Sequence, residues 1–166
     1  MDNLNELKIM LTAAITAVMG LLGWQGMLLL VWVALMLADY ISGSLAAKRT
    51  GNWSSRAARD GVMHKGGMVL VVLAAGLTDL VLGTAWEHLG LFDFQWPWLV
   101  LALVLMWYCL TEIGSILENA GKMGAPIPGW FAAALDAGLH IVDSKGEEIA
   151  EKIAEEKREQ EGIENG

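Results

Sequence analysis

The stretch from Leu28 to Ala38 contains eleven apolar residues in succession, and it constrains the fold more than any other part of the chain. A helix of these residues has no polar face, and such a helix lies either in a deep protein core or in a membrane. A second apolar run, from Met68 to Ala75, follows after a short segment rich in Lys and Arg. Short loops of this kind remain on the cytoplasmic side of a membrane. The pattern therefore predicts a helical hairpin that crosses a bilayer and has its turn in the cytoplasm.

The composition favours a membrane protein and argues against a nucleic-acid-binding one. Apolar residues make up 55% of the 166 residues and charged residues 18%, whereas ordinary soluble domains have about 45–50% and about 25%. The formal net charge is −8, and residues 143–166 contribute most of it through nine acidic and four basic side chains. The chain therefore has no overall basic field for nucleic acid. Its length fits one domain.

Four apolar segments predict an all-α fold, an integral membrane bundle of three to four transmembrane helices with a charged C-terminal helix or tail. The segments comprise residues 9–23, 26–47, 62–86 and 96–118. A helix needs about 17–25 mostly apolar residues to cross a bilayer. The first segment is short enough either to cross at a tilt, which we favour, or to lie flat in the interface. Both arrangements place the C-terminus in the cytoplasm.

Basic residues beside the segments predict which ends face the cytoplasm. These topology determinants are Lys48, Arg49, Arg56, Arg59 and Lys122. The loop 87–95 has no Lys or Arg and is expected on the opposite side. Residues 1–128 are thus predicted to form the membrane domain. Residues 129–166 are predicted to form an amphipathic to charged cytoplasmic helix or tail.

Four ionisable residues interrupt the apolar segments: Asp39, Lys65, Asp79 and Glu112. Each costs about 2.5–3.5 kcal/mol on insertion scales, so such groups usually face a bundle interior or water. The first two and Glu112 lie near the cytoplasmic third of three different helices. They either pair these helices or line a pore and rearrange on assembly. Asp79 has no cation at its depth, so we expect it to contact water or another subunit.

Small residues recur in the same segments, where they allow helices to approach closely. The candidates for such packing are Gly43, Ala46, Ala47, Gly66, Gly67 and Gly76.

Enzymatic motifs are not evident in the sequence. The three histidines, His64, His88 and His140, lack the spacing of metal ligands. The single cysteine, Cys109, cannot form a disulfide within the chain. We expect no catalytic residues, no metal and no cofactor.

Two blocks of sequence resemble the toxin secretion/phage lysis holin family over residues 24–135. The first is Asp39-Tyr40-Ile41-Ser42-Gly43 with Ala46-Ala47, followed by Gly51, Ser54-Ser55, Gly61 and Lys65. The second is Glu112-Ile113-Gly114-Ser115-Ile116-Leu117-Glu118-Asn119, followed by Gly121, Met123-Gly124 and Pro126-Ile127-Pro128. The order and spacing of the two blocks make the resemblance fairly specific.

The resemblance implies a phage or prophage protein that accumulates in the host cytoplasmic membrane. It would oligomerise into holes that release an endolysin or a toxin, so its partners would be the bilayer, further copies of itself and that cargo. The family implies no cofactor and no catalytic residue. The long acidic tail departs from the short basic tails expected of the family.

Two other functions fit parts of the pattern. A membrane anchor or scaffold would recruit a partner through the charged tail. A small ion channel or transporter is disfavoured, because the sequence shows no internal repeat or pair of broken helices.

Overall fold

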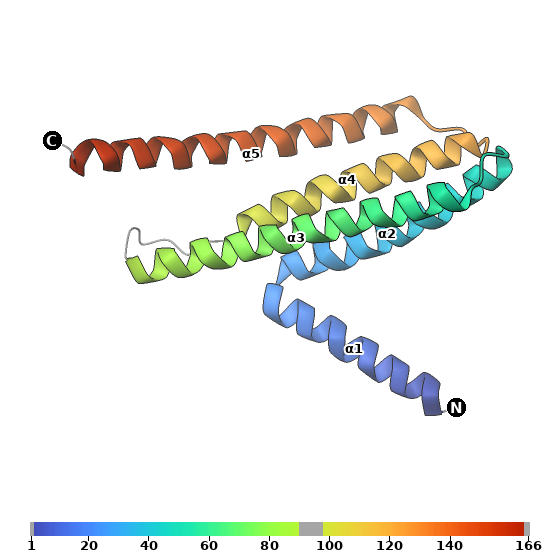
Figure 1. The fold of residues 1–166 in the computed structure, drawn as a ribbon, viewed down its shortest axis with the longest axis horizontal. Coiled ribbons are helices and arrows are strands. Elements are labelled where there is room, and N and C mark those ends of the chain that lie inside the picture. The colour runs from blue at the N-terminus through green and yellow to red at the C-terminus, as the bar shows by residue number, and fades with distance from the viewer. Residues whose placement is uncertain (1, 90–97, 165–166) are drawn as a thin grey trace.

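The computed structural model describes residues 2–89 and 98–164, where all regular structure is helical. The helices are α1 (Asp2–Leu22), α2 (Trp24–Arg49), α3 (Ser55–Leu89), α4 (Leu99–Lys122) and α5 (Gly129–Glu164). Figure 1 shows that α2, α3 and α4 run side by side with alternating direction, and that α5 returns along α4. The predicted all-α fold class is confirmed.

Three helices are long and apolar enough to cross a membrane: Trp24–Arg49, Ser55–Ala85 and Leu99–Lys122. They contain the expected segment 26–47 and most of the segments 62–86 and 96–118. Residues 96–97 and most of the predicted loop 87–95 lie outside the described residues. Helix α1 is not among the candidate spans of the described chain, so a crossing by residues 9–23 stays a prediction. The chain is a multi-pass membrane protein with an all-helical membrane domain.

The turn between α2 and α3 is shorter than the segment rich in Lys and Arg that separates the two apolar runs. Helix α2 continues through Arg49, and α3 begins at Ser55. The Ser54 hydroxyl accepts a hydrogen bond from the backbone N–H of Ala57 at 3.1 Å, which caps the start of α3. Gly51 provides the left-handed backbone of the turn, with φ of 74°. The basic linker residues therefore extend the two helices beyond their apolar parts.

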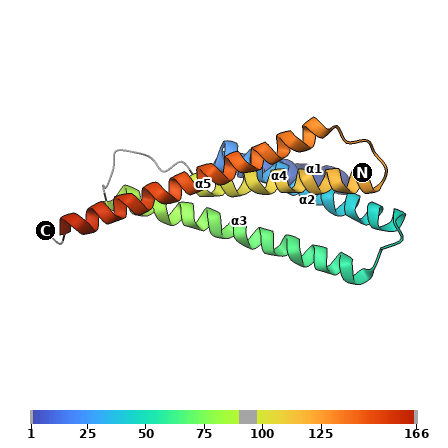
Figure 2. The same cartoon turned by 90° about the horizontal axis from the view of Figure 1, so that it is seen from above.

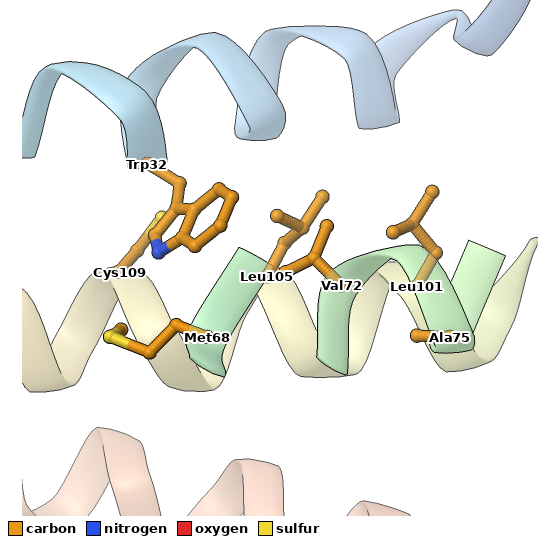
Figure 3. Packing of buried hydrophobic residues seen from close by; sticks show 7 residues of the cluster. All are labelled: Trp32, Met68, Val72, Ala75, Leu101, Leu105 and Cys109. Carbon is orange, nitrogen blue, oxygen red and sulfur yellow. The ribbon is translucent and has the colours of Figure 1, made fainter. Parts of the chain in front are cut away.

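The core is formed by one apolar face each of α2, α3 and α4 (Figure 3). Its buried members are Trp32, Met68, Val72, Ala75, Leu101, Leu105 and Cys109. The α3 and α4 members recur at every third or fourth position, so each set lies on one face of its helix. The Trp32 and Tyr108 rings stack with centroids 5.9 Å apart.

The outward faces of α2 and α3 are also apolar. Leu37, Leu70, Leu73, Leu77 and Val81 are each more than half exposed. Soluble monomers rarely expose a contiguous apolar patch of more than a few hundred Å². These faces are therefore suited to contact with lipid.

Helix α1 leaves the bundle at an angle to α2 (Figure 1). Gly23 joins the two helices with φ of 58° and ψ of −133°. This backbone conformation is accessible mainly to glycine. The abrupt change of direction is therefore a property of the backbone at this residue.

Candidate functional site: an ion network between three spans

Lys65 on α3 contacts two carboxylates on two other helices. Its Nζ lies 2.9 Å from Asp39 Oδ2 on α2, and 2.8 and 2.6 Å from the two Glu112 oxygens on α4. One ammonium group thus joins all three candidate spans. Within this single chain, Asp39, Lys65 and Glu112 pair the three helices. A role of these residues in lining a pore stays a prediction.

Two further side chains extend the network toward the end of the bundle at which α2 and α4 terminate. The Asn119 amide on α4 donates hydrogen bonds to Asp39 Oδ1 at 3.0 Å and to Ser42 Oγ at 3.2 Å. Neither Asn119 nor Ser42 was among the predicted site residues. Spacing could have found Asn119, because it follows Glu112 by seven residues and therefore lies two turns further along the same face of α4.

The network carries two carboxylates and one ammonium group and is largely shielded from solvent. The side chains of Lys65 and Asp39 are each 16% exposed, and that of Glu112 is 4% exposed. Charges at this burial are tolerable only when they are paired and hydrogen-bonded. Each helix therefore depends on the other two to neutralise or solvate the charge that it brings.

A narrow crevice connects this network to the turn between α2 and α3. It has a volume of 170 Å³ and is lined by Asp39 and Lys65 at its inner end and by Trp53 and Ser54 at the turn. A water molecule in the liquid occupies about 30 Å³. Its walls are mostly apolar, with the ions at the inner end, and its volume exceeds that of several water molecules.

Asp79 is buried at the start of α4. It is 2% exposed, and its oxygens accept hydrogen bonds from the backbone N–H groups of Val100 at 3.1 Å and Leu101 at 2.7 Å. The first N–H groups of a helix lack partners within the helix, and the positive end of its dipole favours an anion. Asp79 of α3 thus caps the start of α4. A further contact of Asp79 with water or with another subunit stays a prediction.

The small residues divide into two groups. A Cβ added at Gly43 would lie 3.4 Å from Asn119 Nδ2, and one added at Gly76 would lie 4.0 Å from Leu101. Ala46 is 2% exposed and Ala47 is half-buried, so these two also lie at helix contacts. Gly66 and Gly67 are exposed and would meet nothing within 4 Å. They do not pack helices together within one chain, and a role between chains stays a prediction.

The predicted topology determinants gather at one end of the bundle. Lys48 and Arg49 lie in the last turn of α2, and Lys122 lies in the last turn of α4. Arg56 and Arg59 lie in the first turns of α3, which starts at the same end (Figure 1). Cations at helix C-termini also complement the negative end of the helix dipole. Whether this end faces the cytoplasm stays a prediction.

Helix α5 packs directly against α4. A Cβ added at Gly114 would lie 3.3 Å from Leu135 Cδ2, and one added at Gly138 would lie 3.3 Å from Leu110 Cδ1. Val142, one turn further along α5, is 6% exposed. The segment expected as an amphipathic to charged helix or tail is one continuous helix of 36 residues, and glycines on both helices allow close contact.

The outward face of α5 is charged. Glu148 lies 2.5 Å from Lys145 Nζ and 2.9 Å from Lys152 Nζ. Hydrogen bonds from these two ammonium groups lower the pKa of Glu148 from 4.5 to about 2. They are contacts between neighbours three and four residues apart, which support the helix itself.

The described residues contain no cluster that resembles a metal centre. Within residues 2–89 and 98–164, no group of three or more His, Cys, Asp or Glu side chains is placed to hold a metal ion.

Comparison with known proteins places the chain in a family. Residues 16–138 match the bacteriophage holin family. An uncharacterized protein of Listeria monocytogenes is 34% identical over 132 residues, which cover 80% of this chain and 83% of the relative. An uncharacterized protein of Halalkalibacterium halodurans is 33% identical over 119 residues, which cover 72% and 83%. No solved structure matches the chain at a significant level. The chain therefore belongs to the bacteriophage holin family.

Proposed function

We propose that this protein is a holin that oligomerises in a bacterial cytoplasmic membrane and forms lesions. Through these lesions an endolysin or a toxin leaves the cytoplasm. Family membership supports the membrane location and the class of function. The observation that carries the proposal is the ion network, because a bundle that only anchors a tail has no need of three charges inside its spans.

The network lets the subunits exchange partners without losing charge pairing. In one chain, Lys65 neutralises Asp39 and Glu112. When many copies are close together, the same groups can pair between chains or face water. The crevice beside Lys65 leaves space next to the ions within one chain. The free-energy cost of separating the ion pairs within one chain is therefore offset by equivalent ion pairs between chains. The exchange of partners becomes favourable as the protein accumulates.

The basic test is inducible expression in a bacterium, alone and beside a cytoplasmic muralytic enzyme. Culture density and membrane potential are followed. We expect a delay and an abrupt depolarisation, with lysis only when the enzyme is present. Continued growth with an intact membrane potential would contradict the proposal.

The role of the network is tested in the same assay with Asp39→Leu and Glu112→Leu. We expect both changes to shift the time of lysis and the size of the oligomer. Glu118→Leu is the matched control, because this carboxylate on α4 is 76% exposed and lies 3.7 Å from Lys122. Unchanged timing and oligomer size in the first two variants would remove the basis of the mechanism.

A second candidate function is an anchor that recruits a partner through α5. The exposed charged face of this 36-residue helix favours it. Deletion of residues 144–166 separates the two functions. An anchor would lose its function with the tail, whereas a holin would still depolarise the membrane, on a changed schedule.

A further inference from the structure

Helix α5 has two faces that require different surroundings. Its apolar face packs on α4 around Leu135, Gly138 and Val142. Its other face carries Asp136, whose side chain is 77% exposed, and His140, whose side chain is 79% exposed. Each charge at the centre of a bilayer costs about 2.5–3.5 kcal/mol even on insertion scales. Lipid therefore cannot cover the outward face of α5.

The close contact between α5 and α4 lies in the half of α4 that ends at Lys122, where Gly114 meets Leu135 and Gly138 meets Leu110; beyond it the two helices flank a hollow. Helix α5 lies antiparallel to α4 and continues past the start of α4 (Figure 1). At 1.5 Å per residue, 36 residues extend about 54 Å, while the hydrocarbon core is about 30 Å thick. Helix α5 is therefore long enough for its charged face to extend beside α4 across the bilayer.

The molecule has a lipid side and a polar side, with α4 between them. Among the described helices, α5 contacts α4 but neither α2 nor α3. The second view, in Figure 2, also shows α5 lying along α4. The outward residues of α2 and α3 are apolar and exposed, as at Leu37 and Leu77. Lipid is therefore expected beside α2 and α3, and not beside α5.

A hollow between α4 and α5 has mixed character. Its volume is 650 Å³; α4 lines it with Leu103, Val104 and Trp107, and α5 with Asp143 and Glu147. Carboxylates that face a space of this size need water. The α5 side of the middle of α4 is thus suited to water, although α4 itself is apolar enough to span the bilayer.

We propose that α5 lies inside the assembled lesion, between the α4 helices of neighbouring copies and the water that fills the opening. The surface of α4 beneath α5 is then the inner side of each subunit, and the charged face of α5 borders the water. This inference rests on the proposed function, because it requires an assembly that encloses water. It differs from the expectation of a free cytoplasmic tail.

Cysteine cross-linking in the full-length chain tests the placement of α5. In a Cys109→Ala background, the pair Leu110→Cys and Gly138→Cys joins positions that touch in the structure. The control pair is Leu110→Cys and Asp136→Cys, because Asp136 points outward. In membranes that have become leaky, a short bifunctional methanethiosulfonate should join the first pair about tenfold faster, since access controls thiol reactions. Equal rates in leaky membranes would overturn the inference and leave the holin function standing.

Labelling of the outward face tests its contact with water. A bulky membrane-impermeant maleimide should react with Ser144→Cys in the open assembly and slow the release of a cytoplasmic fluorescent protein several-fold. Leu77→Cys, on the lipid side, should neither react nor change release. An unreactive Ser144→Cys, or a reaction without effect on release, would overturn the placement in the opening. Membranes that never become leaky, even with the unmodified chain, would instead refute the proposed function.

Discussion

Replacement of Lys65 by Met removes the only cation that contacts Asp39 and Glu112 in the described network. The ammonium lies 2.6–2.9 Å from the nearest oxygen of each carboxylate. Removing one partner of a buried ion pair costs about 3–5 kcal/mol, because a buried charge is left uncompensated. Ordinary hydrogen bonds between membrane helices contribute only about 0.6 kcal/mol on average. We therefore expect Lys65→Met to lower the free energy of unfolding by about 3 kcal/mol or more.

The measurement is reversible unfolding in mixed micelles by SDS titration, followed by circular dichroism. Lys122→Met is the matched control, because its side chain is 56% exposed and 3.7 Å from Glu118. Exposed pairs of this kind contribute about 0–1 kcal/mol.

A triple variant checks the physical reason for the loss. Asp39→Asn, Lys65→Met and Glu112→Met together remove all three charges and keep an acceptor for Asn119. Replacing a buried ion cluster by uncharged residues is often neutral or stabilising, so most of the lost stability should return. A loss below about 1 kcal/mol in Lys65→Met, or a triple variant as unstable as the single one, would refute the reasoning.

Three further predictions concern Asp79, Gly138 and Glu148, which lie outside the ion network. Asp79→Ala should cost about 1–3 kcal/mol in the same titration, because two buried N–H groups lose their acceptor; unchanged stability would contradict the capping role. Gly138→Leu should overpack the contact with α4 and speed amide exchange in α5, whereas Gly146→Leu should not, because no atom lies within 4 Å of an added Cβ. Carboxyl NMR should show Glu148 titrating near pH 2, and Lys145→Ala should raise this pKa. Because the pKa is lowered in the folded helix, the pair supports α5 fully above pH 4.5 and is lost as the pH falls toward 2.

The sequence predicted the main architecture because each candidate span contains a long apolar run. The run from Leu28 to Ala38 needs only local information to be identified as a span. The meeting of Asp39, Lys65 and Glu112 was one of two alternatives, because it depends on equal depth in three antiparallel helices. The depth of each residue in the membrane can be estimated by counting from the basic end of its helix. The direction in which its side chain points cannot be obtained in this way.

Other features depended on contacts that no local pattern contains. The partners of Asp79 are backbone N–H groups of another helix, so a search for a cation could not find them. Gly66 and Gly67 look identical in sequence to the packing glycine Gly43, but they lie on the open side of α3. The charges of α5 indicated a surface in water. No pattern in the sequence distinguishes Gly138, which contacts α4, from Gly146, which contacts nothing.

The central position of α4 sets the order in which the bundle can be completed during synthesis. Helices α2 and α3 emerge from the ribosome first, yet the core that buries Trp32 and Met68 is built largely on α4. Before α4 is inserted, the hairpin of α2 and α3 can form one ion pair, between Lys65 and Asp39. The arrival of Glu112 then brings a second carboxylate to a lysine that is already engaged. Each newly made subunit thus passes through a stage with a balanced charge and an open side, and a defect in α4 would leave it there.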